Sequence, residues 1–332
     1  MDSINAKNPY IRVENLKKFF STKRGLLHAV DDVSFDVQKG ETLGLVGESG
    51  CGKSTLGRCL IRLLDATSGR VILHDEKNKE DVDVTKASKS AMKHLRKKVQ
   101  IVFQDPYSCL NPRLSVWELI AEPLIVNDVF PDKNATRSRV RELMSIVGLA
   151  ERLENSYPHE LDGGRRQRIG IARSLALNPE FIVLDEPVSA LDVCIQAQIL
   201  NLLNDLQREF HYTYVFISHN LSVVKHVSDR IAVMYLGKIV ELSSYKELFV
   251  KPTHPYTQAL LSAIPEAKLD VQKERIILEG DVPSPIEPPD GCRFMGRCRH
   301  CMEICKKETP ELKEVSGGRA APNHFVACHL QQ

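Results

Sequence analysis

Gly47-Glu48-Ser49-Gly50-Cys51-Gly52-Lys53-Ser54-Thr55 is the stretch that decides the fold of this chain. It fits the pattern G-x-x-x-x-G-K-[ST], with Cys51 at a variable position, and the apolar residues 42–46 before it predict a buried strand. Glycines allow consecutive backbone N–H groups to wrap an anion, and the N-terminus of the helix expected next adds partial positive charge. We expect Lys53 to reach the β- and γ-phosphates of a nucleotide and the Ser54 hydroxyl to bind magnesium.

A second signal is a pair of carboxylates at the end of another apolar run. Residues 181–184 are Phe-Ile-Val-Leu, and Asp185 and Glu186 follow them directly. In a nucleotide site Asp185 would hold magnesium, directly or through water, and Glu186 would polarise the attacking water. His219 ends the next predicted strand. Together with the phosphate loop, these residues indicate an ATP-hydrolysing site.

The remaining pattern predicts an α/β fold with a P-loop nucleotide-binding core. Strands that alternate with helices after Pro179 imply a mostly parallel sheet, and we expect an antiparallel β edge beside it. Residues 74–98 suggest a solvated hairpin and surface helix, and helical periodicity predicts a helical subdomain at about 107–178. Breaks at 251–255 and in the proline-rich residues 281–291 separate a nucleotide domain, 1–250, from a C-terminal extension, 251–332.

Composition excludes several classes of protein. Of the 332 residues, 42% are hydrophobic and 27% charged, which is the balance of a globular protein. The net charge of +2 does not suggest a nucleic-acid partner. Neither a signal peptide nor a membrane-spanning run is found, so we expect a chain that stays in the cell without crossing the membrane. Five of the nine cysteines fall between Cys292 and Cys328, which in a reducing cytosol suggests metal ligation.

The order of the motifs resembles that of the ABC-transporter nucleotide-binding family over the first 250 residues. Gln104 is similar to the family's Q-loop glutamine, a further magnesium ligand, and His219 to its switch histidine. Leu161-Asp162-Gly163-Gly164-Arg165 stands where the signature belongs, and Ser189-Ala190-Leu191-Asp192 matches the D-loop. Phe20, or alternatively Phe19, falls where the family has an aromatic that stacks on adenine.

The resemblance implies a mechanism and a set of partners. Two nucleotide domains would close head to tail, each ATP lying between one chain's phosphate loop and the other chain's signature. Glu186 would then orient water, His219 would steady the γ-phosphate, and Gln104 would transmit closure toward membrane subunits.

A narrower resemblance points to the dipeptide and oligopeptide importer ATPases. It is carried by His254-Pro255-Tyr256-Thr257-Gln258-Ala259-Leu260-Leu261, with Asp105-Pro106-Tyr107-Ser108 and Leu110-Asn111-Pro112-Arg113 in the same style. It implies a peripheral subunit on the cytoplasmic face of the membrane. Its partners would be a related but different ATPase, two transmembrane permeases and, through the complex, an external solute-binding protein.

The same resemblance implies a metal centre in the extension. Cys292, Cys298, Cys305 and Cys328 match the spacing in the similar importer tails, where four thiolates suit a four-iron four-sulfur cluster. Zinc is the alternative, because four cysteines also make a closed tetrahedral site. Cys301 is extra to the pattern and could replace a neighbour as ligand.

Other functions stay open at this point. One is a soluble ABC-type ATPase in DNA repair or translation, although this chain has neither two nucleotide domains nor a long coiled coil. A second is ATP binding without turnover, against which Glu186 and His219 argue. As an importer, the chain could also serve nickel, glutathione or another solute.

Asp162 departs from the family's signature, which has serine there. Aspartate caps a helix as well as serine does, so the fold should not suffer. Its charge would repel the γ-phosphate of the partner's ATP by about 4 kcal/mol at ~4 Å and an effective dielectric of ~20. Pairing with Arg165 across one helical turn would offset only a few tenths of a kcal/mol, roughly. We therefore expect an asymmetric pair in which this chain's signature is the weaker one.

Overall fold

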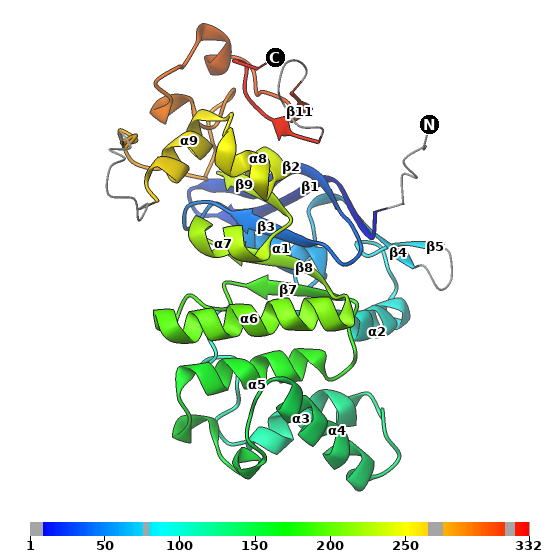
Figure 1. Ribbon diagram of the computed structural model, residues 1–332. Helices are drawn as coiled ribbons and strands as arrows, with labels where there is room; N and C mark the ends of the chain where they lie inside the picture. The colour runs from blue at the N-terminus through cyan, green and yellow to red at the C-terminus, as the bar shows by residue number, and fades with distance from the viewer. Residues whose placement is uncertain (1–8, 76–79, 265–274, 316–322, 332) are drawn as a thin grey trace, which may run out of the picture. The chain divides into compact units, whose positions relative to one another are not determined.

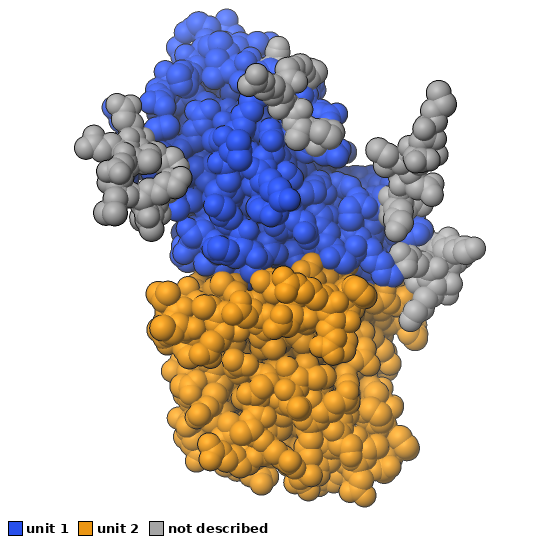
Figure 2. Space-filling model, viewed as in Figure 1, with its two compact units in different colours: residues 1–86, 216–332 blue, residues 87–215 orange. Residues whose placement is uncertain are grey.

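The computed structural model describes residues 9–75, 80–264, 275–315 and 323–331 (Figure 1). The chain divides into two compact units, which are described separately. Unit 1 comprises residues 1–86 and 216–332, and unit 2 comprises residues 87–215 (Figure 2). The phosphate loop belongs to unit 1, and the Asp185-Glu186 pair belongs to unit 2.

Unit 1 contains an antiparallel sheet of four strands in the order β2-β1-β4-β5. These strands are β1 (Ile11–Thr22), β2 (Gly25–Val37), β4 (Ser68–Asp75) and β5 (Glu80–Asp83). Strand β1 pairs with both β2 and β4, and its first half alternates buried and exposed side chains, which is the period of a strand with one face in the core. The sheet provides the predicted antiparallel element. Strands β4 and β5 form a hairpin that begins earlier than predicted, at Ser68 and not near residue 74.

The second sheet of unit 1 is mixed. Its order includes β11-β12-β10-β9-β3, in which β3 and β9 are parallel while β10 pairs with β9 and β12 antiparallel. The strands are β3 (Thr42–Val46), β9 (Arg230–Tyr235), β10 (Lys238–Ser244), β11 (Lys313–Glu314) and β12 (Phe325–Val326). All five residues of β3 are buried, as the apolar run predicted. The α-helices of this unit are α1 (Lys53–Leu60), α7 (Leu221–Val227), α8 (Tyr245–Val250) and α9 (Pro255–Ser262).

Unit 2 combines a short parallel pair of strands with helices. Strands β6 (Val99–Val102) and β7 (Phe181–Asp185) run parallel, and helix α3 packs on α4 and α5. The helices are α2 (Lys89–Lys98), α3 (Val116–Val126), α4 (Lys133–Ile146), α5 (Gly163–Leu175) and α6 (Val193–Phe210), with 3-10 turns at Glu151–Leu153 and Pro158–Glu160. Strand β8 (Thr213–Ser218) spans the boundary of the units. Helices α3, α4 and α5 therefore lie within the range, about 107–178, where helical periodicity predicted them.

Polar caps fix where these helices start. Ser115 and Glu118 form a capping box at α3, and Asp132, Asp162 and Asp192 each accept a backbone N–H at the start of α4, α5 and α6. Such caps satisfy N–H groups that have no partner within the helix. The signature and the D-loop therefore each lead directly into a capped helix.

The C-terminal extension is attached to the rest of unit 1 by a buried polar network. It includes 3-10 turns at Met295–Arg297 and Glu303–Lys306. Glu241 of β10 is fully buried and accepts hydrogen bonds from the backbone N–H of Thr253 (2.8 Å) and His254 (3.0 Å) and from His324 Nε2 (2.7 Å). Because a buried carboxylate is costly unless it is paired, these contacts anchor both ends of the extension to β10.

The cap of helix α9 predicts a pH dependence of stability. His254 Nδ1 accepts the Tyr256 N–H, and burial lowers the pKa of His254 to about 4 although Glu241 raises it. Since the folded pKa lies below the ordinary value of about 6.5, stability should fall as the pH drops below 6.5, by about 2 kcal/mol at pH 5. Urea unfolding of the full chain at pH 7 and pH 5 measures this. His254→Asn keeps a capping oxygen and should show a smaller loss, whereas an equal loss in the variant would contradict the assignment.

Candidate nucleotide site

The phosphate loop connects β3 to α1 in unit 1, as its sequence predicted. At two of its glycines the loop backbone passes so close to a neighbouring carbonyl oxygen that no side chain would fit. Gly47 has φ 156°, and a Cβ there would lie 2.1 Å from the Met234 carbonyl oxygen of β9. Gly52 has φ 106°, and a Cβ there would lie 1.9 Å from the Ala29 carbonyl oxygen of β2. Both positions therefore require glycine for space and for backbone conformation.

Lys53 is the first residue of α1 and is almost fully buried, with 4% of its surface exposed. Its ammonium donates to the carbonyl oxygens of Gly47 (2.8 Å) and Glu48 (2.9 Å), so it lies inside the curve of the loop. The Cys51 thiol is 3.8 Å from the same nitrogen, and burial raises the pKa of Cys51, which keeps that side chain neutral. One positive charge is thus held where the pattern expects phosphate.

The extension also contacts the phosphate loop, which the sequence did not reveal. The Glu48 N–H donates to the Tyr256 hydroxyl of α9 (3.0 Å), and the Glu48 carboxylate pairs with Arg297 Nη1 (2.9 Å). Glu48 is separated from these residues by 208 and 249 positions. The His-Pro-Tyr stretch marked Tyr256 as part of a family element, but no local signal singled out Arg297.

The carboxylates of unit 2 lie at the end of strand β7. Asp185 is 1% exposed, and Glu186 follows with φ 47°, a left-handed conformation that is uncommon for glutamate. Gln104 Nε2 donates to Glu186 Oε2 (3.1 Å), so the structure brings together two of the predicted catalytic residues. This bond uses the amide nitrogen and leaves the amide oxygen, the atom that would bind magnesium, for another partner.

The signature and the D-loop also meet within unit 2. Cβ atoms on Gly163 and Gly164 would lie 3.1 Å from Leu191 and 2.6 Å from Ile195. Asp162 caps α5 by accepting the Arg165 N–H (2.8 Å), and its second oxygen is 3.4 Å from Arg165 Nε. The expected cap and ion pair are therefore present. Both side chains are about half exposed, so the pair contributes little energy.

The other predicted nucleotide contacts lie in unit 1. His219 is exposed directly after β8. Of the two candidate aromatics, Phe19 stacks on His28 with ring centres 4.1 Å apart, whereas Lys18 lies over the Phe20 ring. Both aromatics lie on β1, and Phe20 as the adenine contact stays a prediction.

The cysteines of the extension do not form a metal site in the described residues. No three histidine, cysteine, aspartate or glutamate side chains among them are grouped so as to hold a metal ion. Burial and the neighbouring thiols Cys305, Cys328 and Cys298 raise the pKa of Cys292 to about 11. The thiols of Cys298, Cys305 and Cys328 are thus close enough to affect the pKa of Cys292. Their arrangement nevertheless does not support the prediction of a metal-binding extension.

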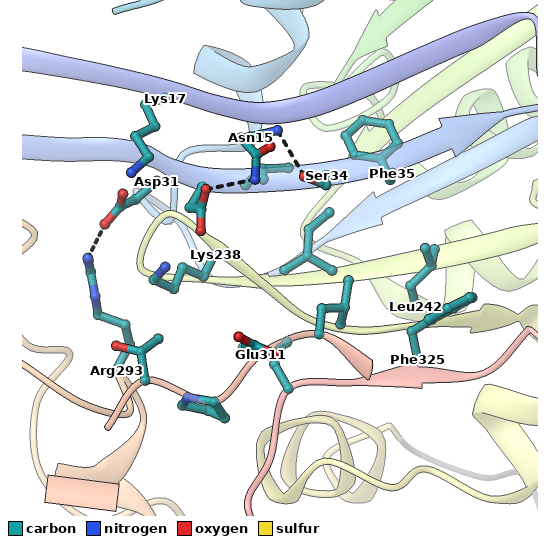
Figure 3. A pocket seen from close by; sticks show the side chains of 18 of the residues that line it. Asn15, Lys17, Asp31, Ser34, Phe35, Lys238, Leu242, Arg293, Glu311 and Phe325 are labelled. Carbon is teal, nitrogen blue, oxygen red and sulfur yellow. Dashed lines mark hydrogen bonds and ion pairs between the residues drawn. The ribbon is translucent and has the colours of Figure 1, made fainter. Parts of the chain in front are cut away.

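A separate hollow of about 1030 Å³ lies in unit 1 between the two sheets and the extension (Figure 3). Cys292 is the only predicted site residue in its lining. Its polar groups largely satisfy one another: Arg293 pairs with Asp31, and Asn15 donates to Asp32 (3.2 Å) and Ser34 (2.9 Å). No residue of the phosphate loop lines the hollow, so the two are distinct.

The family model "ABC transporter" matches residues 30–189, and "Oligopeptide/dipeptide transporter, C-terminal region" matches residues 240–305. The chain belongs to the ABC transporter family. Within it, the chain is a member of the oligopeptide and dipeptide transporter ATP-binding subunits, because both models match in this order and the relatives below cover nearly the whole chain.

Relatives match over nearly the full length. The oligopeptide transport ATP-binding protein AppF of Bacillus subtilis is 50% identical over 96% of this chain and 97% of its own length. The putative peptide import ATP-binding protein BOV_A0347 of Brucella ovis is 45% identical over 97% of this chain and 98% of its own length. The dimeric post-hydrolysis structure of the ATP-binding cassette MJ0796 with ADP and Pi is 28% identical, with a TM-score of 0.63, over 71% of this chain and 98% of that one.

No helix among the described residues is long and apolar enough to cross a membrane.

Replacing Lys53 with alanine should abolish productive ATP binding, because the phosphates lose the one buried cation inside the loop. Binding of a fluorescent ATP analogue to the full chain measures this. Lys23→Ala, an exposed lysine of the same unit, serves as the control and should bind normally. Unchanged affinity in Lys53→Ala would contradict the assignment of the loop.

Proposed function

We propose that this chain is the ATP-hydrolysing motor of an importer of di- or oligopeptides. The observation that carries the proposal is the order of the two family matches, a nucleotide domain followed by a C-terminal region of the oligopeptide and dipeptide type. A soluble ATPase of DNA repair or translation would not need that second region. The importers of nickel, glutathione or another solute remain the competing assignments.

In unit 1 the proposed role is to hold the nucleotide. Backbone N–H groups of the loop and the N-terminus of α1 favour an anion, and Lys53 supplies the positive charge. The Ser54 hydroxyl is the proposed magnesium ligand of this unit, Phe20 the adenine contact and His219 the group that steadies the γ-phosphate.

In unit 2 the proposed role is to act on the water and the metal. Asp185 and Gln104 provide oxygen atoms, which magnesium prefers, so the donor set fits the ion. Magnesium would neutralise developing charge on the phosphates. Glu186, held by Gln104, would orient the attacking water, and phosphoryl transfer needs such positioning more than it needs covalent chemistry.

The partners follow from the same proposal. A related ATPase would supply a signature to this chain's loop, while Asp162 to Arg165 and the D-loop residue Asp192 would serve the partner's ATP. Two permease subunits would hold the pair at the cytoplasmic face of the membrane as a peripheral complex, and an external binding protein would deliver the solute. Soluble ribosome-bound or DNA-bound chain after native extraction would contradict this.

We further propose that the extension binds metal through Cys292, Cys298, Cys305 and Cys328, as a four-iron four-sulfur cluster rather than zinc. In support, the neighbouring thiols of Cys298 and Cys305 help to raise the pKa of the Cys328 thiol, after burial as the main cause. The Cys292 N–H also donates to the Cys305 carbonyl (2.8 Å). Cys301, by contrast, is exposed. The ligand set would therefore need only local rearrangement, and the bound group would crosslink the extension.

Glu186→Gln should stop ATP-dependent uptake of labelled peptides almost fully while leaving a closed, ATP-loaded dimer, because the change affects only the attacking water. The matching change in the partner ATPase should be milder, since Asp162 weakens the other site, and Asp162→Ser should raise ATP affinity at the partner's loop. Uptake and nucleotide binding in the reconstituted complex measure both, with the exposed Glu209→Gln as control.

Equal severity of the two glutamate variants, or a fully active homodimer of this chain, would refute the asymmetry. Uptake of nickel or glutathione in place of peptides would refute the solute assignment alone.

Cys305→Ser should lose bound metal, and Cys301→Ser should retain it, because only the first is a proposed ligand. Anaerobic purification, visible absorption and metal analysis of the full chain measure this. A colourless chain with stoichiometric zinc would refute the cluster, and metal-free wild-type chain would refute the metal site altogether.

A further inference from the structure

We propose that the C-terminal extension positions the phosphate loop for ATP, with Arg297 acting as a positioning residue through Glu48. This inference goes beyond the role of the loop itself, although it depends on the loop being the ATP site. All the contacts that carry it lie within unit 1.

Glu48 is held at two points by residues more than 200 positions away. Its N–H donates to the Tyr256 hydroxyl, and its carboxylate pairs with Arg297, whose side chain is only 10% exposed. The pair is therefore a partly buried, charge-assisted contact, of the kind whose truncation is costly.

The segment that carries Arg297 is itself fixed to the frame of the unit. Four residues earlier, the buried Arg293 pairs with Asp31 of β2 and donates to the Leu236 carbonyl (3.2 Å). The adjoining Gly237 donates its N–H to the Cys51 carbonyl of the phosphate loop (2.9 Å). Two arginines of one short segment thus anchor it to β2 and to the loop.

Aromatic packing holds the same segment rigidly. Phe294 is buried against Tyr235 and Tyr256, with ring centres 5.3 Å and 5.5 Å apart. Tyr235 and Tyr256 also pack on each other at 4.7 Å. Arg297 therefore approaches Glu48 from a preorganised support, which reduces the entropy lost when the contact forms.

The charge of Glu48 explains why the loop needs this contact. A carboxylate in a phosphate-binding loop opposes the binding of a polyanion, and an arginine paired with it cancels most of that repulsion. The Tyr256 hydroxyl meanwhile fixes the direction of the Glu48 N–H. Arg297 thus acts on ATP affinity through Glu48 without touching the nucleotide.

The test compares Arg297→Met with Arg299→Met, an exposed arginine on the other side of Cys298. Arg297→Met should weaken binding of the fluorescent ATP analogue to the full chain by about tenfold, because the Glu48 carboxylate is left unpaired. In the assembled complex the KM for ATP should rise while kcat at saturating ATP stays near the wild-type value. Arg299→Met should change neither.

A double variant separates positioning from loss of fold. Glu48→Gln combined with Arg297→Met should bind ATP more tightly than Arg297→Met alone, since the unpaired charge is gone, and Arg297→Lys should restore part of the affinity. A double variant as weak as the single one, or a parallel fall in kcat and thermal midpoint, would overturn the proposal. If Lys53→Ala leaves the ATP affinity unchanged, the loop is not the ATP site. If Lys53→Ala abolishes ATP binding but Arg297→Met does not weaken it, only the proposed role of Arg297 is refuted.

Discussion

The phosphate-loop backbone lies directly against carbonyl groups of two strands in unit 1, and this contact constrains its sequence. Gly47 lies against Met234 of β9 and Gly52 against Ala29 of β2, at distances that exclude any Cβ. Because β9 is parallel to β3 and β2 belongs to the antiparallel sheet, the loop contacts both sheets of the unit. The start of α1 and the buried position of Lys53 follow from that double contact.

Sequence alone predicted the parts that depend on local pattern. The phosphate loop, the apolar strand before Asp185 and the capping role of Asp162 each depend on a few neighbouring residues, and the structure contains all three elements. The contacts of Glu48 with Tyr256 and Arg297 could not be predicted, because they depend on how distant segments pack. The stacking of Phe19 on His28 likewise depends on the pairing of two strands, which no local pattern specifies.

The extension illustrates the difference between spacing and arrangement. A metal held by its cysteines would crosslink a proline-rich segment of the chain. The described residues show other anchors: the buried Phe294, the Arg293–Asp31 pair, and the Glu241 network that holds His254 and His324. Attachment of the extension to β10 therefore does not depend on the thiols, and a bound metal would act mainly on the segment around Cys298 and Cys305.

At the start of helix α5, Asp162 meets the needs of the fold and still carries a negative charge. Asp162 gives one oxygen to the Arg165 N–H and lies near the Arg165 side chain with the other, so helix α5 starts as it would with serine. The ion pair is about half exposed, where such pairs contribute less than about 1 kcal/mol and are screened by salt. Capping consumes hydrogen-bonding capacity but does not remove the negative charge. The fold therefore tolerates Asp162, and in the proposed pair a phosphate at the partner's loop would face that charge.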